Sequence, residues 1–135
     1  MITATTGHAR IQYDGKHFLK VHLEDDILID ELDVIEQRSE IAKLTKGAPH
    51  VLMVITAQNS SATKEAREYS SQNKPEGRIA EALVVTSVPM RLMASVYISF
   101  NKPTVPTRYF DNEKSAEKWL QKMLISSELS VSALQ

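Results

Sequence analysis

The sequence predicts an α/β domain built on a mixed β-sheet. Two short apolar runs, residues 51–56 and 82–86, have the length and character of strands that are buried on both faces. Each run is followed by polar residues and then by a helical pattern, as in parallel strands that are joined by helices. Two alternating segments, 9–13 and 18–23, come first and indicate an antiparallel hairpin. The sheet should therefore be antiparallel at its start and parallel in its second part, with right-handed crossovers.

Turn and cap residues mark the ends of the early elements. Asp14 and Gly15 are a strong turn signal between the two hairpin strands. Asp30 is a suitable N-cap for the helix that follows, because its carboxylate can accept a hydrogen bond from the first turn. Gly47 suits the position just past the end of that helix, and Pro49 prevents its continuation.

The second half of the chain predicts three longer helices and one short helix. Thr63 opens the first of them, and a short helix over 76–81 precedes the second buried strand. Pro89 lies just inside the next helix, where its missing N–H costs nothing. A short strand at 108–110 leads to Asp111, which we expect to cap the last helix.

A single domain over residues 9–124 is expected, because no repeat or long linker divides the chain. Residues 1–8 have the composition of a flexible polar end. Residues 125–135 form a serine-rich tail, for which we expect either mobility or a contact in an oligomer.

The composition narrows the classes of function. Sixteen basic residues balance seventeen acidic ones, so we expect no nucleic-acid partner. The absence of cysteine excludes disulfides, thiolate metal sites and a cysteine nucleophile, and it is typical of a reducing compartment. The N-terminus does not resemble a secretory signal, and no apolar segment is long enough to span a bilayer. We therefore expect a cytoplasmic protein.

No catalytic or metal-binding pattern is found in the sequence. The four glycines are isolated and build neither a nucleotide-binding loop nor a serine-hydrolase turn. The acidic group in 24–33 lacks the glycine and terminal glutamate of a calcium loop, and a solvated turn with a helix start explains it. The histidines lack ligand spacing; they are His8, His17, His22 and His50. We expect no catalytic residue, no metal and no cofactor.

A polar loop follows the first buried run, where open α/β sheets place their sites. Its hydroxyl groups and the helix N-terminus favour an anion or a phosphate. The simpler interpretation, which we favour, is that Thr63 caps the helix and the serines fill the loop. Nearby cations can pair with an anionic ligand, although surface ion pairs are their commoner use. The candidate binding residues are Asn59, Ser60, Ser61, Thr63, Lys64, Arg67 and Lys102.

The predicted helix 89–100 is apolar around most of its circumference. Such a helix is usually packed on both sides, here against the sheet and the last helix, and this is the interpretation we favour. It can also serve as a subunit contact or as the methionine-lined wall of a ligand pocket. Together with the apolar tail residues Leu129, Val131 and Leu134, it predicts self-association, for example as a homodimer.

Three segments carry a resemblance to a known family. Residues 63–69 (TKEAREY), 101–107 (NKPTVPT) and 110–120 (FDNEKSAEKWL) resemble a bacterial family of uncharacterised small proteins. That family has a SpoIIAA-like fold and is grouped with STAS and SEC14-type domains. The resemblance covers residues 9–123 and implies a mixed sheet with helices packed mainly on one side, without a cofactor.

The better-understood STAS relatives are anti-sigma-factor antagonists that are switched by phosphorylation of a serine in a D-x-S motif. The matching place here, residues 56–61, reads TAQNSS and contains no aspartate. We therefore expect a non-enzymatic regulatory or binding module whose loop 57–63 and neighbouring helices contact a protein partner or a small ligand. The alternative is a carrier of a lipid or small apolar ligand. An enzyme would need an acid or base with a shifted pKa beside Ser60 or Ser61.

Overall fold

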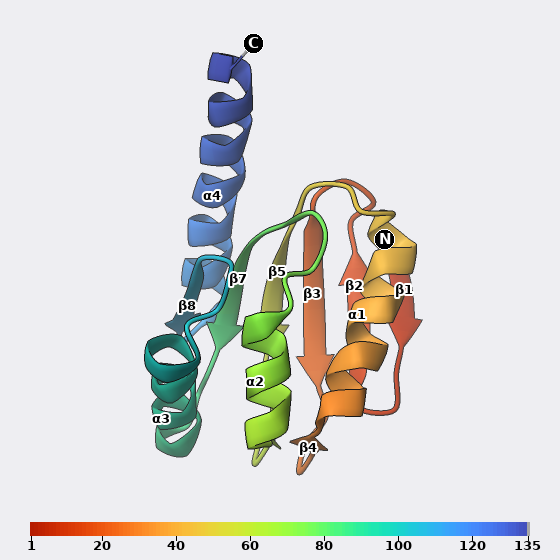
Figure 1. The fold of residues 1–135 in the computed structure, drawn as a ribbon. Coiled ribbons are helices and arrows are strands. Elements are labelled where there is room, and N and C mark those ends of the chain that lie inside the picture. The colour runs from red at the N-terminus through yellow and green to blue at the C-terminus, as the bar shows by residue number, and fades with distance from the viewer. Residues whose placement is uncertain (135) are drawn as a thin grey trace.

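The computed structural model describes residues 1–134, with side chains through residue 128. A six-stranded sheet has the order β1-β2-β3-β5-β7-β8 (Figure 1). Its strands are β1 (Ile2–Thr5), β2 (Ala9–Tyr13), β3 (Phe18–Leu23), β5 (His50–Ile55), β7 (Arg78–Val84) and β8 (Thr107–Phe110). The pairs β1–β2 and β2–β3 are antiparallel, and the remaining pairs are parallel. The predicted α/β class with a mixed sheet is confirmed.

Two further strands and five helical segments complete the described chain. The strands β4 (Leu28–Ile29) and β6 (Ser61–Ala62) form a small parallel pair beside the main sheet. The helical segments are α1 (Glu31–Thr45), α2 (Lys64–Gln72), α3 (Val88–Val96), the π-helix η1 (Tyr97–Asn101) and α4 (Glu113–Leu134). Among residues 1–134, no helix combines the length and the apolar character needed to cross a membrane.

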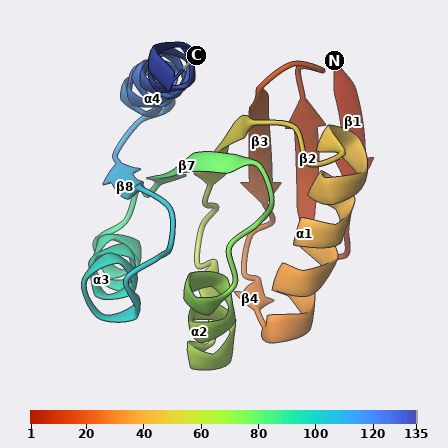
Figure 2. The same cartoon turned by 45° about the horizontal axis from the view of Figure 1, so that its top comes forward.

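The helices divide unequally between the two faces of the sheet. Helices α1, α2 and α3 lie together on one face, while α4 lies apart from them (Figure 2). Strand β5 shows that α4 packs on the opposite face, because Val51 and Met53 belong to the same core cluster as Ala116 of α4, whereas Leu52 belongs to that of Ile41 in α1. Val51, Leu52 and Met53 have no exposed surface. The central strand is therefore buried on both faces, as predicted.

The Asp30 cap and the hairpin turn expected from the sequence are present. The Asp30 carboxylate accepts a 2.8 Å hydrogen bond from the Asp33 N–H, and the Asp33 carboxylate accepts one from the Asp30 N–H at 2.9 Å. This reciprocal arrangement satisfies two of the free N–H groups at the start of α1. In the hairpin, Asp14 Oδ1 accepts from three successive N–H groups, those of residues 16–18, and Gly15 has a φ of 81°.

Two expectations about the strands were wrong. Residues 2–5 are not a loose end, because they pair with β2 in the register Ile2↔Tyr13. The segment 76–81 is not a short helix, since β7 begins at Arg78 and runs in parallel beside β5. A turn at Gly77, whose φ is 79°, directs the chain into that strand. Pairing with β5 outweighs the helical tendency of these residues.

The last helix also differs from the prediction at both ends. Asn112, not Asp111, caps it, because Asn112 Oδ1 accepts a 2.8 Å hydrogen bond from the Ser115 N–H. Helix α4 continues through Leu134, so residues 125–134 are helical. The side chains of the apolar tail residues, Leu129, Val131 and Leu134, lie outside the described residues.

Helix α3 is not packed on both sides as predicted, because α4 lies across the sheet from it. One side of α3 faces the sheet and α2. The other side, continued by η1, leaves a row of apolar side chains exposed at intervals of four residues. We call this row the α3 stripe; it consists of Val88, Leu92 and Val96 of α3 and Phe100 of η1.

Candidate ligand-binding site

The loop predicted as the site is held by hydrogen bonds to the turn after β3. Asp26 N–H donates to the Gln58 carbonyl at 2.8 Å, and the Asp25 carboxylate accepts from the Gln58 N–H at 3.0 Å. Asn59 has a positive φ of 59° and donates through Nδ2 to Asp26 Oδ1 at 3.0 Å. The loop is therefore shaped by these contacts, which use the polar groups of Gln58 and Asn59.

The hydroxyl groups of Ser60 and Thr63 have structural partners. Ser60 is buried, and its Oγ both accepts from the Ala57 N–H and donates to the Ala57 carbonyl. Thr63 Oγ1 accepts from the Ala66 N–H at 3.1 Å and caps α2. Ser61 is half-buried and lies in β6. The simpler interpretation of this loop thus accounts for Ser60 and Thr63.

The three predicted cations do not come together. Lys64 is exposed and lies 3.8 Å from Glu68 on the same helix. Lys102 is exposed and directly follows η1, the segment that continues α3. Arg67 points inward, and its Nη1 donates to the Ala62 carbonyl at 2.7 Å.

Arg67 and Ser61 line a cavity of about 150 Å³ that is partly open to solvent. The cavity lies between the sheet and the three helices α1, α2 and α3. Its wall is mostly apolar, and α3 contributes Met90, Met93 and Ala94. An apolar cavity of roughly this volume holds a molecule the size of benzene. The methionine-lined wall, which the sequence offered as an alternative, is therefore present, and it lies on the inner side of α3.

Arg78 and Glu81 form an ion pair in the cavity wall. Arg78 is buried, and its Nη1 lies 3.1 Å from Glu81 Oε1. They meet although they are three residues apart on a strand, because the pairing of β5 with β7 shifts between His50 and Val51. An extra residue at such a bulge re-aims the side chains before it, which brings Arg78 to the Glu81 side.

A neutral histidine supports the arginine. Arg78 Nε donates to His50 Nε2 at 3.0 Å, and His50 Nδ1 lies 2.9 Å from the Ala48 carbonyl. Burial and the Arg78 charge together lower the pKa of His50 to about 4, against the hydrogen bond to Ala48, which raises it. The imidazole is therefore neutral near pH 7 and accepts from Arg78 while donating to Ala48.

Tyr97 and Arg38 complete the polar wall. Burial raises the pKa of the Tyr97 phenol, and the Glu81 carboxylate raises it further, so the hydroxyl stays protonated. Arg38 donates to the carbonyls of Ser70 and Asn73. The cavity thus combines a mostly apolar wall with several charged and polar groups.

Sequence reasoning found Ser61 and Arg67 but missed Arg78, Glu81 and Tyr97. The expected short helix over 76–81 included the first two. One signal was available: Arg78 and Glu81 flank the apolar pair 79–80, directly before the buried run 82–86, so that opposite charges stand at the start of a strand.

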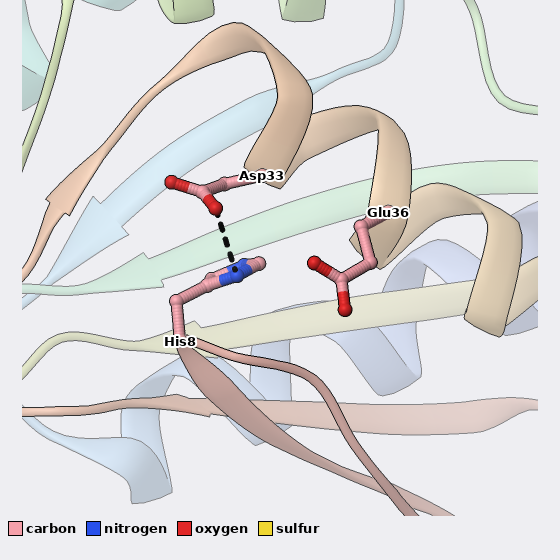
Figure 3. Close-up of side chains that lie close together, drawn as sticks. All are labelled: His8, Asp33 and Glu36. Atoms are coloured by element: carbon pink, nitrogen blue, oxygen red, sulfur yellow. Dashed lines mark ion pairs between the residues drawn. The ribbon is translucent and has the colours of Figure 1, made fainter.

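A separate cluster joins the hairpin to α1. His8, Asp33 and Glu36 each offer one ligand atom, and these atoms lie within 4.8 Å of one another. Figure 3 shows both carboxylates turned toward the His8 ring, with Asp33 Oδ1 3.6 Å from Nδ1. The ring nitrogens also lie 3.2 Å from Thr6 Oγ1 and 3.4 Å from Gln37 Oε1. These contacts explain the cluster as a link between β2 and α1.

Residues 13–124 match the family described as Domain of unknown function (DUF7793). The chain belongs to this family. No curated protein shows significant sequence similarity to this DUF7793 domain.

The fold of this DUF7793 domain is similar to that of a solved structure. That structure is of an uncharacterised protein of the DUF3478 family with a SpoIIAA-like fold, from Shewanella loihica PV-4. The sequences are 12% identical, the match covers 87% of this chain and 98% of the other, and the TM-score is 0.58. At this identity the likeness shows the fold alone. The SpoIIAA-like fold expected from the sequence is confirmed.

Proposed function

We propose that this protein is a non-enzymatic binding module that holds a small ligand with an apolar body in the cavity between the sheet, α2 and α3. The observation that supports this most directly is the cavity itself, which has a mostly apolar wall with a few polar and charged groups. Well-packed interiors rarely leave a space of this size. The proposal joins the small-ligand and carrier expectations from the sequence. We also expect a cytoplasmic location, which the absence of cysteine favours.

Filling the cavity tests the proposal. Ala94 is buried on α3 and lines the cavity. We expect Ala94→Leu to raise the free energy of unfolding by about 0.5–2 kcal/mol, as cavity-filling substitutions commonly do. The same change should abolish binding of toluene as a probe, measured by amide chemical shifts of α2 and α3 in a titration.

The matched control is Arg91→Leu, which adds a leucine to the same helix at an exposed position outside the cavity. This variant should bind toluene like the wild type. The proposal would be overturned if Ala94→Leu bound toluene unchanged, or if toluene left the amides of α2 and α3 of the wild type undisturbed.

A protein contact is the second candidate, favoured by the α3 stripe. Its four apolar side chains are from 43% to 81% exposed, and rows of this kind mark contact surfaces. In this version the module acts through a protein partner, as anti-sigma-factor antagonists do, or forms the expected homodimer. Light scattering at high micromolar concentration should then give a mass above the 15.1 kDa of one chain, and Leu92→Ser should reduce it. A monomeric wild type would contradict the homodimer hypothesis.

A further inference from the structure

We infer that the ligand carries an anionic group, such as a carboxylate, which Arg67 binds inside the cavity. The inference rests on the proposed function and names the chemical class of the ligand. It follows from the charges of the cavity wall, from two buried donors and from the way each arginine is held.

The wall of the cavity has an excess of positive charge. Among its lining residues in the described part of the chain, three arginines face one glutamate: Arg38, Arg67 and Arg78 against Glu81. Glu81 lies 3.1 Å from Arg78 and balances one of these charges. Burying a charge without a counter-charge is costly, so the remaining excess favours an anion over a neutral ligand.

Two buried donors in this wall are unused. Within residues 1–134, Arg67 Nε and Arg78 Nη2 are buried and have no hydrogen-bond partner. Buried polar groups almost always have one, and an arginine side chain is an especially costly exception. Both residues line the same cavity, and the side chain of Arg78 is only 2% exposed. A carboxylate beside Arg67 would accept from its unused Nε–H, and Arg78, unlike Arg67, already has a counter-charge in Glu81.

The other nitrogen atoms of both arginines hold them in position. Arg78 is fixed by His50 through Nε and by Glu81 through Nη1, which leaves Nη2 free. Arg67 is fixed by the Ala62 carbonyl through Nη1. Donors that are already oriented lose little freedom when a ligand binds, so the arrangement is suited to recognition.

A set of three probes of similar size tests the inference: toluene, benzyl alcohol and benzoate, titrated into the whole chain by calorimetry and NMR. We expect benzoate to bind at least about tenfold tighter than the two neutral probes, since a hydrogen bond to a charged group contributes that much. The Arg67 Nε–H resonance should shift on addition of benzoate and stay in place with toluene.

Arg67→Gln should reduce the affinity for benzoate by about tenfold while leaving that for toluene unchanged. Arg91→Gln, which changes an exposed arginine of α3, is the control and should bind all three probes like the wild type. If Arg67→Gln fails to fold, the shift of the Arg67 Nε–H resonance in the wild type on addition of benzoate tests the inference.

The possible outcomes separate the two proposals. Tighter binding of benzoate with a shifted Arg67 resonance would support the inference. Binding of toluene with equal or weaker binding of benzoate would overturn the anionic group and leave the proposed function standing. If none of the three probes bound at millimolar concentration, both the proposed function and the inference would fall.

Discussion

Replacing Glu81 with leucine is expected to lower the free energy of unfolding by roughly 3 to 5 kcal/mol. Glu81 is the counter-charge of Arg78, whose side chain is 2% exposed. Without it, the guanidinium remains buried and charged, because arginine does not lose its proton in proteins. Urea denaturation, followed through the fluorescence of the single Trp119, measures the change.

Two comparisons separate the loss of charge from other effects. Glu117→Leu removes an exposed glutamate of α4 and should change stability by less than about 0.5 kcal/mol. Adding Arg78→Met to Glu81→Leu should restore part of the lost stability, because the uncompensated charge is then gone. A double variant that is much less stable than Glu81→Leu would contradict this account of the pair.

Gly77→Ala is expected to destabilise the protein by about 3 kcal/mol or more. Gly77 has a φ of 79°, and a Cβ there would lie 2.4 Å from the Ala48 carbonyl oxygen and 2.7 Å from that of Gly47. Both are backbone atoms, so relief would require a shift of the chain. The Gly77 carbonyl also accepts from the His50 N–H at 2.9 Å, so such a shift would disturb the start of β5.

Gly15→Ala is the matched control for this substitution. Gly15 has almost the same φ, 81°, but a Cβ there would meet nothing within 4 Å. Gly15→Ala should therefore lower the free energy of unfolding only by the backbone strain, about 1–2 kcal/mol. Thermal unfolding of both variants gives the comparison, and equal losses would show that the clash at Gly77 is relieved without cost.

Sequence reasoning succeeded where the structure depends on neighbours along the chain. The hairpin, the Asp30 cap of α1 and the Thr63 cap of α2 are each decided by a few adjacent residues, and all three were predicted. It failed at β7 because Arg78 and Glu81 neutralise each other only after that strand has paired with β5. A charge that is satisfied by tertiary contact has the same appearance in a sequence as a solvated one.

In the candidate site, too, residues set by neighbours along the chain were predicted and those set by tertiary contacts were not. Arg67 was found because it follows the central strand and its loop. Tyr97 was assigned to an apolar helix with no indication of the side that it faces. Lys102 was grouped with the loop as one of the cations nearest to it, whereas in the structure it follows η1 and is exposed. Direction and register are properties of the assembled sheet.

The order of strands in the sheet has a consequence for synthesis on the ribosome. In β1-β2-β3-β5-β7-β8 every strand joins the edge left by the one before it, and none is inserted between two others. A nascent chain can therefore extend the sheet as each strand emerges. Helix α4 follows all the strands in the chain. The face of β5 and β7 that carries Val51, Met53 and Ala82 therefore stays exposed until α4 has left the exit tunnel. During that interval this apolar face is the surface that a chaperone would bind.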